Sequence, residues 1–140
     1  MAGHLAFPDV ELMLTGDGVD PGFLEGHGHC FTELPVDFQN DYLPTKPVIR
    51  VTRVGGGDGN NRTTDRPRVM VQVFVKRDAD KPREAYEVAA AIRADMLNAA
   101  TVTPWGRFDS AETESGPAPY PWADPTVRAV QMVFRLSTRR

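Results

Sequence analysis

The sequence predicts an α+β fold: a mixed, mainly antiparallel sheet of about four to five strands, with one long helix at about 81–97 and a short N-terminal helix packed on it. Two segments rich in β-branched residues, 47–54 and 68–75, flank a glycine-rich stretch. The segment that follows them, 81–97, has apolar residues at helical spacing. We expect these two strands and this helix to form the core of the molecule.

Length and composition indicate one globular domain over residues 1–140. The chain has 140 residues, of which 41% are hydrophobic and 25% charged, and this is the range of folded rather than disordered proteins. The net charge of −3 argues against a general nucleic-acid binder, which would be basic. Cys30 is the only cysteine, so we expect no internal disulfide and synthesis in a reducing, intracellular compartment. No apolar run long enough to span a membrane is present.

Alternating side chains define the two central strands. Valine occupies every second position from Val69 to Val75, which predicts one buried strand face, and Met70 and Phe74 lie on the other. The glycine-rich segment 55–67 between the strands is expected to be a hairpin loop. It lacks the Gly-Lys-Ser/Thr ending of a phosphate-binding loop, and a strand follows it instead of a helix.

Two helices are predicted from capping and periodicity. Asp80 is a candidate N-cap for the helix at 81–97. The apolar stripe of this helix consists of Ala85, Val88, Ala89, Ile92 and Met96. Residues 7–14 predict a short helix that must dock on the sheet, because a helix of this length is unstable alone.

Three further strands are expected at 27–34, 107–115 and 126–136. The ten residues 116–125 contain four prolines, which exclude a helix or a central strand and predict an extended connection. The acidic and aromatic loop 35–47 is long, and such loops are usually functional or ordered by a partner. The tail 137–140 is expected to fray.

The only metal-like cluster is His27-Gly28-His29-Cys30. Alternate side chains of a strand face the same way, so His27 and His29 can share a ligand. A closed zinc site needs four ligands, however, and no second His/Cys pair exists. Glu112 and Glu114 alternate as an acid pair would, but an exposed strand face is the commoner explanation. We therefore predict no catalytic, metal or cofactor site, and expect that the protein is not an enzyme.

Basic and aromatic residues provide the better candidate site, an assembly interface. A basic patch around the strand 68–75 can meet an acidic partner or a phosphate backbone, with a solvated loop as the alternative. Aromatic residues beside the prolines of 116–125 suit a subunit interface, and packing onto their own sheet is equally compatible. The candidate interface residues are Asp58, Arg62, Arg66, Arg68, Tyr120 and Trp122.

Five segments carry a family resemblance through their order along the chain. They are Phe7-Pro8-Asp9-Val10-Glu11, residues 43–56, residues 65–74 with the helix that follows, Glu114-Ser115-Gly116-Pro117, and residues 128–136. Together they resemble the tail terminator, or tail completion, proteins of long-tailed (siphovirus-type) phages, especially those of actinobacterial hosts.

The resemblance implies a structural subunit, without catalysis or cofactor, that forms a homo-oligomeric ring, hexameric in the virion. Such a ring caps the tail tube, halts polymerisation of the tube protein and offers the surface for head–tail joining. The implied partners are the tail tube protein and the head–tail connector protein, with no membrane, and DNA passes through the ring without sequence-specific binding. The implied location is the head-proximal end of the virion tail, after synthesis in the host cytoplasm.

We expect the segments 55–67 and 116–125 to lie at ring or tube contacts. Three alternatives remain open. The first is a head-completion or connector (neck) protein. The second is a small metal-dependent enzyme using His27 and His29. The third is a monomeric module that binds a small molecule or a peptide.

Overall fold

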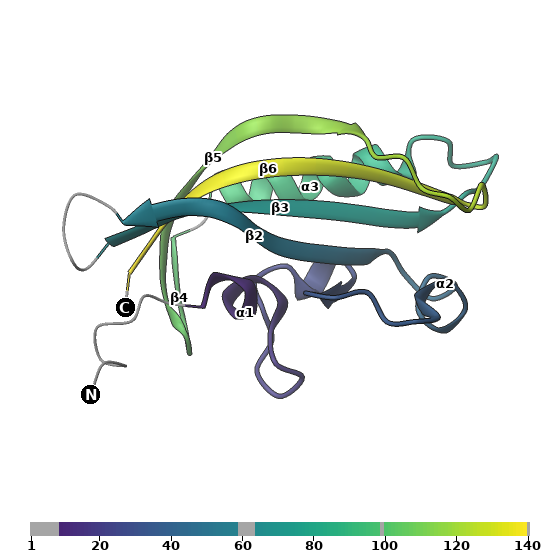
Figure 1. Ribbon diagram of the computed structural model, residues 1–140. Helices are drawn as coiled ribbons and strands as arrows, with labels where there is room; N and C mark the ends of the chain where they lie inside the picture. The colour runs from purple at the N-terminus through teal and green to yellow at the C-terminus, as the bar shows by residue number, and fades with distance from the viewer. Residues whose placement is uncertain (1–8, 59–63, 99, 140) are drawn as a thin grey trace.

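The computed structural model describes residues 9–58, 64–98 and 100–139, and over these residues the chain forms one six-stranded sheet (Figure 1). The strands are β1 His29–Phe31, β2 Val48–Asp58, β3 Thr64–Lys76, β4 Thr101–Thr103, β5 Gly106–Pro119 and β6 Val127–Arg139. Their order is β1-β2-β3-β6-β5-β4. β1 is parallel to β2, and the other pairs are antiparallel. The sheet is therefore mixed and mainly antiparallel, as predicted.

The strand count corrects the prediction of four to five. The additional strand is β4, which has three residues and is too short to carry a period-2 signal. The predicted strand at 27–34 is also reduced to three residues, because His27 ends a short 3-10 helix and Glu33 lies beyond β1. These short strands pair only with the ends of β2 and β5.

The helical segments are α1 Val10–Thr15, the 3-10 helix η2 Glu25–His27, α2 Phe38–Asp41 and α3 Glu84–Leu97. α1 begins after Asp9, whose carboxylate accepts the N–H of Leu12 at 3.1 Å. α3 begins later than expected, and Asp80 is not its N-cap. Asp80 lies in a preceding turn, where its own N–H donates to the Asp78 carboxylate at 2.9 Å, and Arg83 stands at the cap without a side-chain bond.

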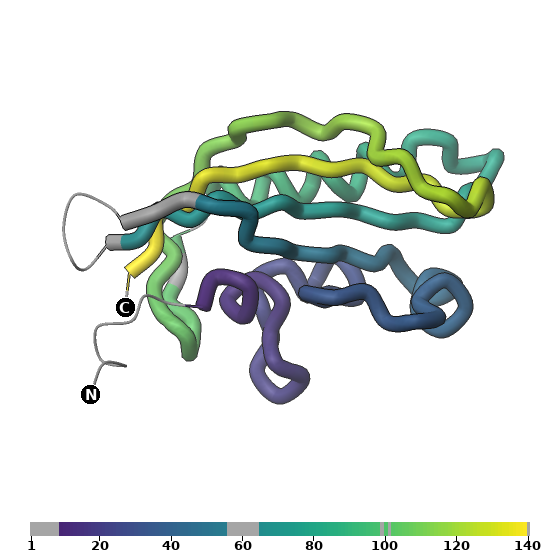
Figure 2. Tube along the Cα trace, in the orientation of Figure 1, coloured from purple at the N-terminus to yellow at the C-terminus, as the bar shows by residue number. Residues whose placement is uncertain are grey.

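α3 packs against one side of the sheet, here called the α3 face (Figure 2). The predicted valine row of β3 is buried here, from Val69 to Val75, together with the α3 stripe, of which Val88 is only partly buried. β6 contributes the row Val130, Met132, Phe134 and Leu136. Burial of side chains of this size stabilises the fold by about 1.5–3 kcal/mol each, so this face holds the main core.

The opposite side of the sheet, here called the α2 face, carries a second and smaller core. Its buried residues are Phe38, Leu43, Val48, Phe74, Val127 and Ala129. The ring of Phe38, from α2, meets that of Phe74 edge to face at 5.4 Å between centroids. The segment 35–47, which was expected to be a loop, forms α2 and covers Phe74 on this face.

The hairpin between β2 and β3 is longer than predicted, and its loop is shorter. Gly55, Gly56, Gly57 and Asp58 pair with Arg68, Pro67, Arg66 and Asp65. The expected loop 55–67 is therefore mostly paired strand, and residues 59–63 lie outside the described residues. The ladder absorbs the glycines through a bulge between Arg53 and Gly55, where Gly55 has φ 149°. The glycines interrupt the strand pattern in the sequence, but the strand itself continues through them.

Two further strand ends also extend beyond the prediction. β5 continues to Pro119, and an edge strand tolerates proline because its outer side needs no N–H donor. β6 continues to Arg139, where Thr138 is buried and pairs with Asp65 and Phe108. Residues 137–139 are thus paired, where fraying was expected.

Candidate assembly surface

The basic residues of β3 lie on the α2 face of the sheet. Arg66 and Arg68 share the side-chain orientation of Met70, and Arg66 is exposed. The Arg68 guanidinium donates to the Glu114 carboxylate at 2.6 Å, and Arg135 approaches the other oxygen of Glu114 at 3.6 Å. The hydrogen bond from Arg68 holds the pKa of Glu114 below its ordinary value. Part of the predicted basic patch is therefore neutralised within the chain.

Asp58, another predicted interface residue, lies at the hairpin end of the β2–β3 ladder. The backbone of Asp58 pairs opposite Asp65, and Arg62 lies outside the described residues. Asp65 itself is buried, and the Arg53 guanidinium donates to both of its carboxylate oxygens at 2.9 and 3.3 Å. This ion pair on the α3 side joins β2 to β3 near the hairpin end.

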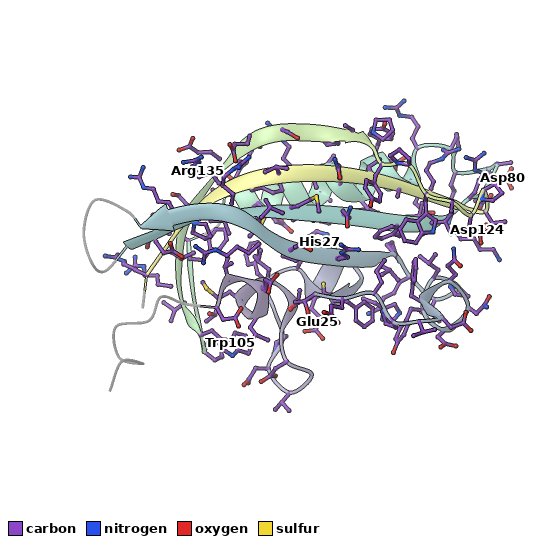
Figure 3. All side chains as sticks on the ribbon, in the orientation of Figure 1. Glu25, His27, Asp80, Trp105, Asp124 and Arg135 are labelled. Atoms are coloured by element: carbon purple, nitrogen blue, oxygen red, sulfur yellow. The ribbon has the colours of Figure 1, made fainter. Side chains whose placement is uncertain are left out.

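Tyr120 and Trp122 are half-buried and pack on their own sheet, which is one of the two alternatives stated for them. Trp122 contacts Phe74 and Phe38 at centroid distances of 4.9 and 5.7 Å. Tyr120 lies 6.3 Å from Trp122. We call Phe38, Phe74, Tyr120 and Trp122 the aromatic cluster. It closes the end of the α2 face nearest to Asp124, which Figure 3 labels.

The predicted interface residues that the structure describes do not form a single site. Arg66 pairs with Gly57 near one end of the β2–β3 ladder, and Phe74 pairs with Val48 at the other end. Phe74 is eight positions after Arg66 along β3, a span of about 26 Å at about 3.3 Å per residue. The surface thus has a basic end, Arg66 with Arg68, and an aromatic end at the aromatic cluster.

The short outer strands β1 and β4 leave much of the outer edges of β2 and β5 unpaired within the described residues. β1 covers β2 only from Val48 to Arg50, and β4 covers β5 only from Gly106 to Phe108. The uncovered parts lie at the same level of the sheet, as two rows show. One row is Thr52–Met70–Val133–Ser115, and two rows further along the strands is Gly55–Arg68–Arg135–Glu112. Sequence patterns missed this surface, because an unpaired edge depends on where the neighbouring strands stop.

The histidines do not converge on a shared ligand. His27 belongs to η2, and its Nε2 lies 2.5 Å from the Asp95 carboxylate of α3. His29 lies in β1 and its Nε2 contacts the Thr45 hydroxyl at 2.8 Å. Strand alternation was wrong for this pair, because His27 is not in the strand. The described residues contain no group of three or more His, Cys, Asp or Glu side chains placed to hold a metal.

Cys30 is half-buried in a concave region of about 490 Å³ beside β1. Burial, with a smaller contribution from Glu25, raises the pKa of its thiol to about 12. The thiolate needed for nucleophilic chemistry is therefore scarce at neutral pH. Desolvation followed by the charge of Lys46 lowers the pKa of the neighbouring His29.

These features define a class of protein: a small α+β protein with a one-sheet core and two partly unpaired edges. The family of phage tail termination proteins matches residues 7–140, and the chain belongs to this family. It is therefore a structural phage tail protein of the virion with a role in tail completion. Among proteins with curated descriptions, none matches the chain. None of the helices described is long and apolar enough to cross a membrane.

Proposed function

We propose that the chain forms a ring that caps the tail tube, stops polymerisation of the tube protein and provides the surface for head–tail joining. Family membership over residues 7–140 supports a tail-completion role. The observation that favours a ring is the pair of unpaired edges at one level of the sheet. Edges at opposite ends of one sheet suit a head-to-tail contact, and such contacts generate a ring when the rotation between neighbouring copies closes.

In this proposal the single domain of residues 1–140 assembles as a hexamer, and DNA passes through the ring without sequence-specific binding. The tail tube protein and the head–tail connector protein meet its two ends. The basic end and the aromatic end of the α2 face are suitable contacts, because about 26 Å of strand separates them. The acidic Asp58 and the basic Arg62, which are close to Arg66 in the sequence, belong to the same proposed contact. The long-tailed phage type and the actinobacterial host also remain predictions.

Deletion of the gene from its phage tests this function. We expect overlong tails, or tails that do not join heads, and rescue by the wild-type gene in trans. Electron microscopy of tail lengths measures the result. Tails of normal length beside empty or leaking heads would contradict tail termination and favour a head-completion protein instead.

Point variants test the proposed contacts within this function. Arg66→Glu reverses an exposed charge at the basic end, and Trp122→Ala removes a large aromatic group at the other end. We expect each variant to lower the yield of normal virions by about tenfold or more, as loss of a central interface residue does. Arg66→Lys and Trp122→Phe are the matched controls. Normal virions from folded Arg66→Glu and Trp122→Ala would remove these residues from the interface.

A further inference from the structure

The outer edge of β2 is closed at one point by a side chain and not by a strand. The Glu11 carboxylate, from α1, accepts the backbone N–H of Arg53 at 3.0 Å. Arg53 lies past Arg50, where β1 stops covering the strand. This N–H points away from β3, so it is the donor that an added strand would use. Glu11 thus occupies the hydrogen-bonding position of a missing neighbour.

The space beside this contact has polar atoms without partners. A concave region of about 480 Å³ is lined by Glu11, Thr32, Glu33, Leu34, Arg50 and Thr52. Within the described residues, the buried Nε of Arg50 and hydroxyl of Thr52 have no hydrogen-bond partner. Buried polar atoms are normally paired. Thr52 lies on β2 just beyond Arg50, the last residue that β1 covers, so the uncovered edge begins beside these unpaired polar atoms.

The matching element is the outer edge of β5. β5 has no strand outside it from Asp109 to Pro119 among the described residues. Three antiparallel steps relate β2 to β5, so the two strands run in opposite directions. A β5 strand laid against the β2 edge of another copy therefore continues the antiparallel pattern. Thr52 and Ser115 share one row of the sheet, so this pairing needs no shift along the strands.

Side chains at the level of the two edges are complementary. Glu112 is exposed and lies on β5, at one end of the row Gly55–Arg68–Arg135–Glu112. The other end of this row is Gly55 on β2. Gly55 has no side chain, so a second backbone can approach closely, as glycine in an edge strand permits. Glu112 of one copy would then face Arg68 of the next across that glycine. Pro119 and Pro117 offer no N–H, which confines pairing to the stretch before them.

We propose that β2 from Thr52 to Gly57 accepts β5, residues 110–115, of a second copy, and that Glu11 caps this edge until the copies assemble. This inference rests on the proposed ring. It specifies the contact between neighbouring copies and the step that frees the β2 edge for that contact. The cap explains how a subunit with an unpaired edge avoids pairing before it meets its site of assembly. On assembly the carboxylate leaves the Arg53 N–H, and a backbone carbonyl of β5 takes its place.

Sedimentation of purified protein tests the cap. Glu11→Ala frees the Arg53 N–H, so we expect its self-association constant to rise by about tenfold or more, the factor that corresponds to about 1.4 kcal/mol. Glu33→Ala is the matched control, because Glu33 lines the same region without bonding the edge, and it should associate as the wild type does. Glu11→Gln keeps the shape and a weaker acceptor, so it should lie between. Equal constants for wild type and the two Glu11 variants would overturn the cap.

A second change tests the partner strand. Glu112→Arg in the Glu11→Ala background places like charges at the proposed contact, so we expect association to return to about the wild-type level. Association that Glu112→Arg leaves unchanged would overturn the assignment of β5 as the partner. Complementation of the deleted phage gene separates this inference from the ring. If the wild-type gene restores normal tail length but Glu11→Ala does not change the association constant, the cap is rejected and the termination role stands.

Discussion

The two faces of the sheet differ in how far their cover extends. On the α3 face, α3 and α1 meet buried residues from β2, β3 and β6 along most of the strand length. On the α2 face, the aromatic cluster and α2 close one end only. Towards the other end this face carries Gln72, half-buried Met70 and the Arg68–Glu114 ion pair. One face is therefore a continuous aliphatic core, and the other is a local aromatic cover followed by polar surface.

This difference predicts that the two faces contribute unequally to stability. The α3 face buries the larger apolar surface, so it should set the global free energy of unfolding. The α2 face buries less, and its cover consists of a four-residue helix and the proline-rich segment. Elements of this kind open at lower cost than a central sheet does. The α2 face is thus the one that can change contacts without loss of the fold.

The largest expected effect comes from a cavity in the α3 face. Phe134 is fully buried in β6, and Phe134→Ala should lower the free energy of unfolding by about 3–5 kcal/mol. Because the core is continuous, protection from hydrogen exchange should fall in α3 as well as in the central strands. Urea unfolding with amide exchange measures both quantities.

Phe74→Ala is the matched change on the other face, since Phe74 is equally buried. It removes the centre of the aromatic cluster, so exchange should accelerate first in α2 and in the segment after Pro119. The amides of α3 should retain more of their protection than in Phe134→Ala. Equal loss of protection in α3 for both variants would contradict the division between the faces.

The next effect is a gain in stability at Gln72, which lies on the α2 face between the aromatic cluster and the polar residues. Gln72 is only 1% exposed, and neither atom of its amide has a partner within the described residues. A buried amide without hydrogen bonds costs about 1–3 kcal/mol. Gln72→Met should therefore raise the free energy of unfolding by about 1 kcal/mol, which thermal and urea unfolding would detect.

Gln131→Met is the control for this change. Gln131 is the next residue of the same row and is half-exposed, so its substitution should change stability by less than about 0.5 kcal/mol. If Gln72→Met were destabilising, the amide of Gln72 would have to make hydrogen bonds in solution.

The α3 face was predictable from sequence because it depends on local periodicity. The valines of β3 and the row from Val130 to Leu136 alternate without interruption, and Ala85, Ala89 and Ile92 recur at helical spacing. Element ends were less predictable. The ladder continues through Gly55–Asp58 because β3 supplies partners there, and a breaker rule takes no account of a partner.

The assembly surface was predictable only in part, because its features depend on contacts across the fold. Trp122 packs on Phe38, and 84 positions separate them in the sequence, so no local pattern decides whether its ring is exposed. Arg68 meets Glu114 through the order β3-β6-β5. The Glu11 contact with Arg53 likewise needs α1 placed beside β2. Residue types indicated where recognition is possible, and the topology determined which groups remain available for it.

The smallest expected effect concerns the polar end of the α2 face and depends on pH. The hydrogen bond from Arg68 lowers the pKa of Glu114 from 4.5 in the folded state, so the unfolded chain binds the proton more readily. The stabilisation is therefore fully present above pH 4.5 and is lost as the pH falls through the lowered pKa. Glu114→Gln should reduce stability slightly at neutral pH, and the difference from wild type should vanish in acid. Urea unfolding across this range measures it, with Glu112→Gln as the control, because Glu112 forms no ion pair among the described residues. A difference that persisted in acid would show that Glu114 contributes through packing, and the polar end would then resemble the aromatic end more closely than its charges indicate.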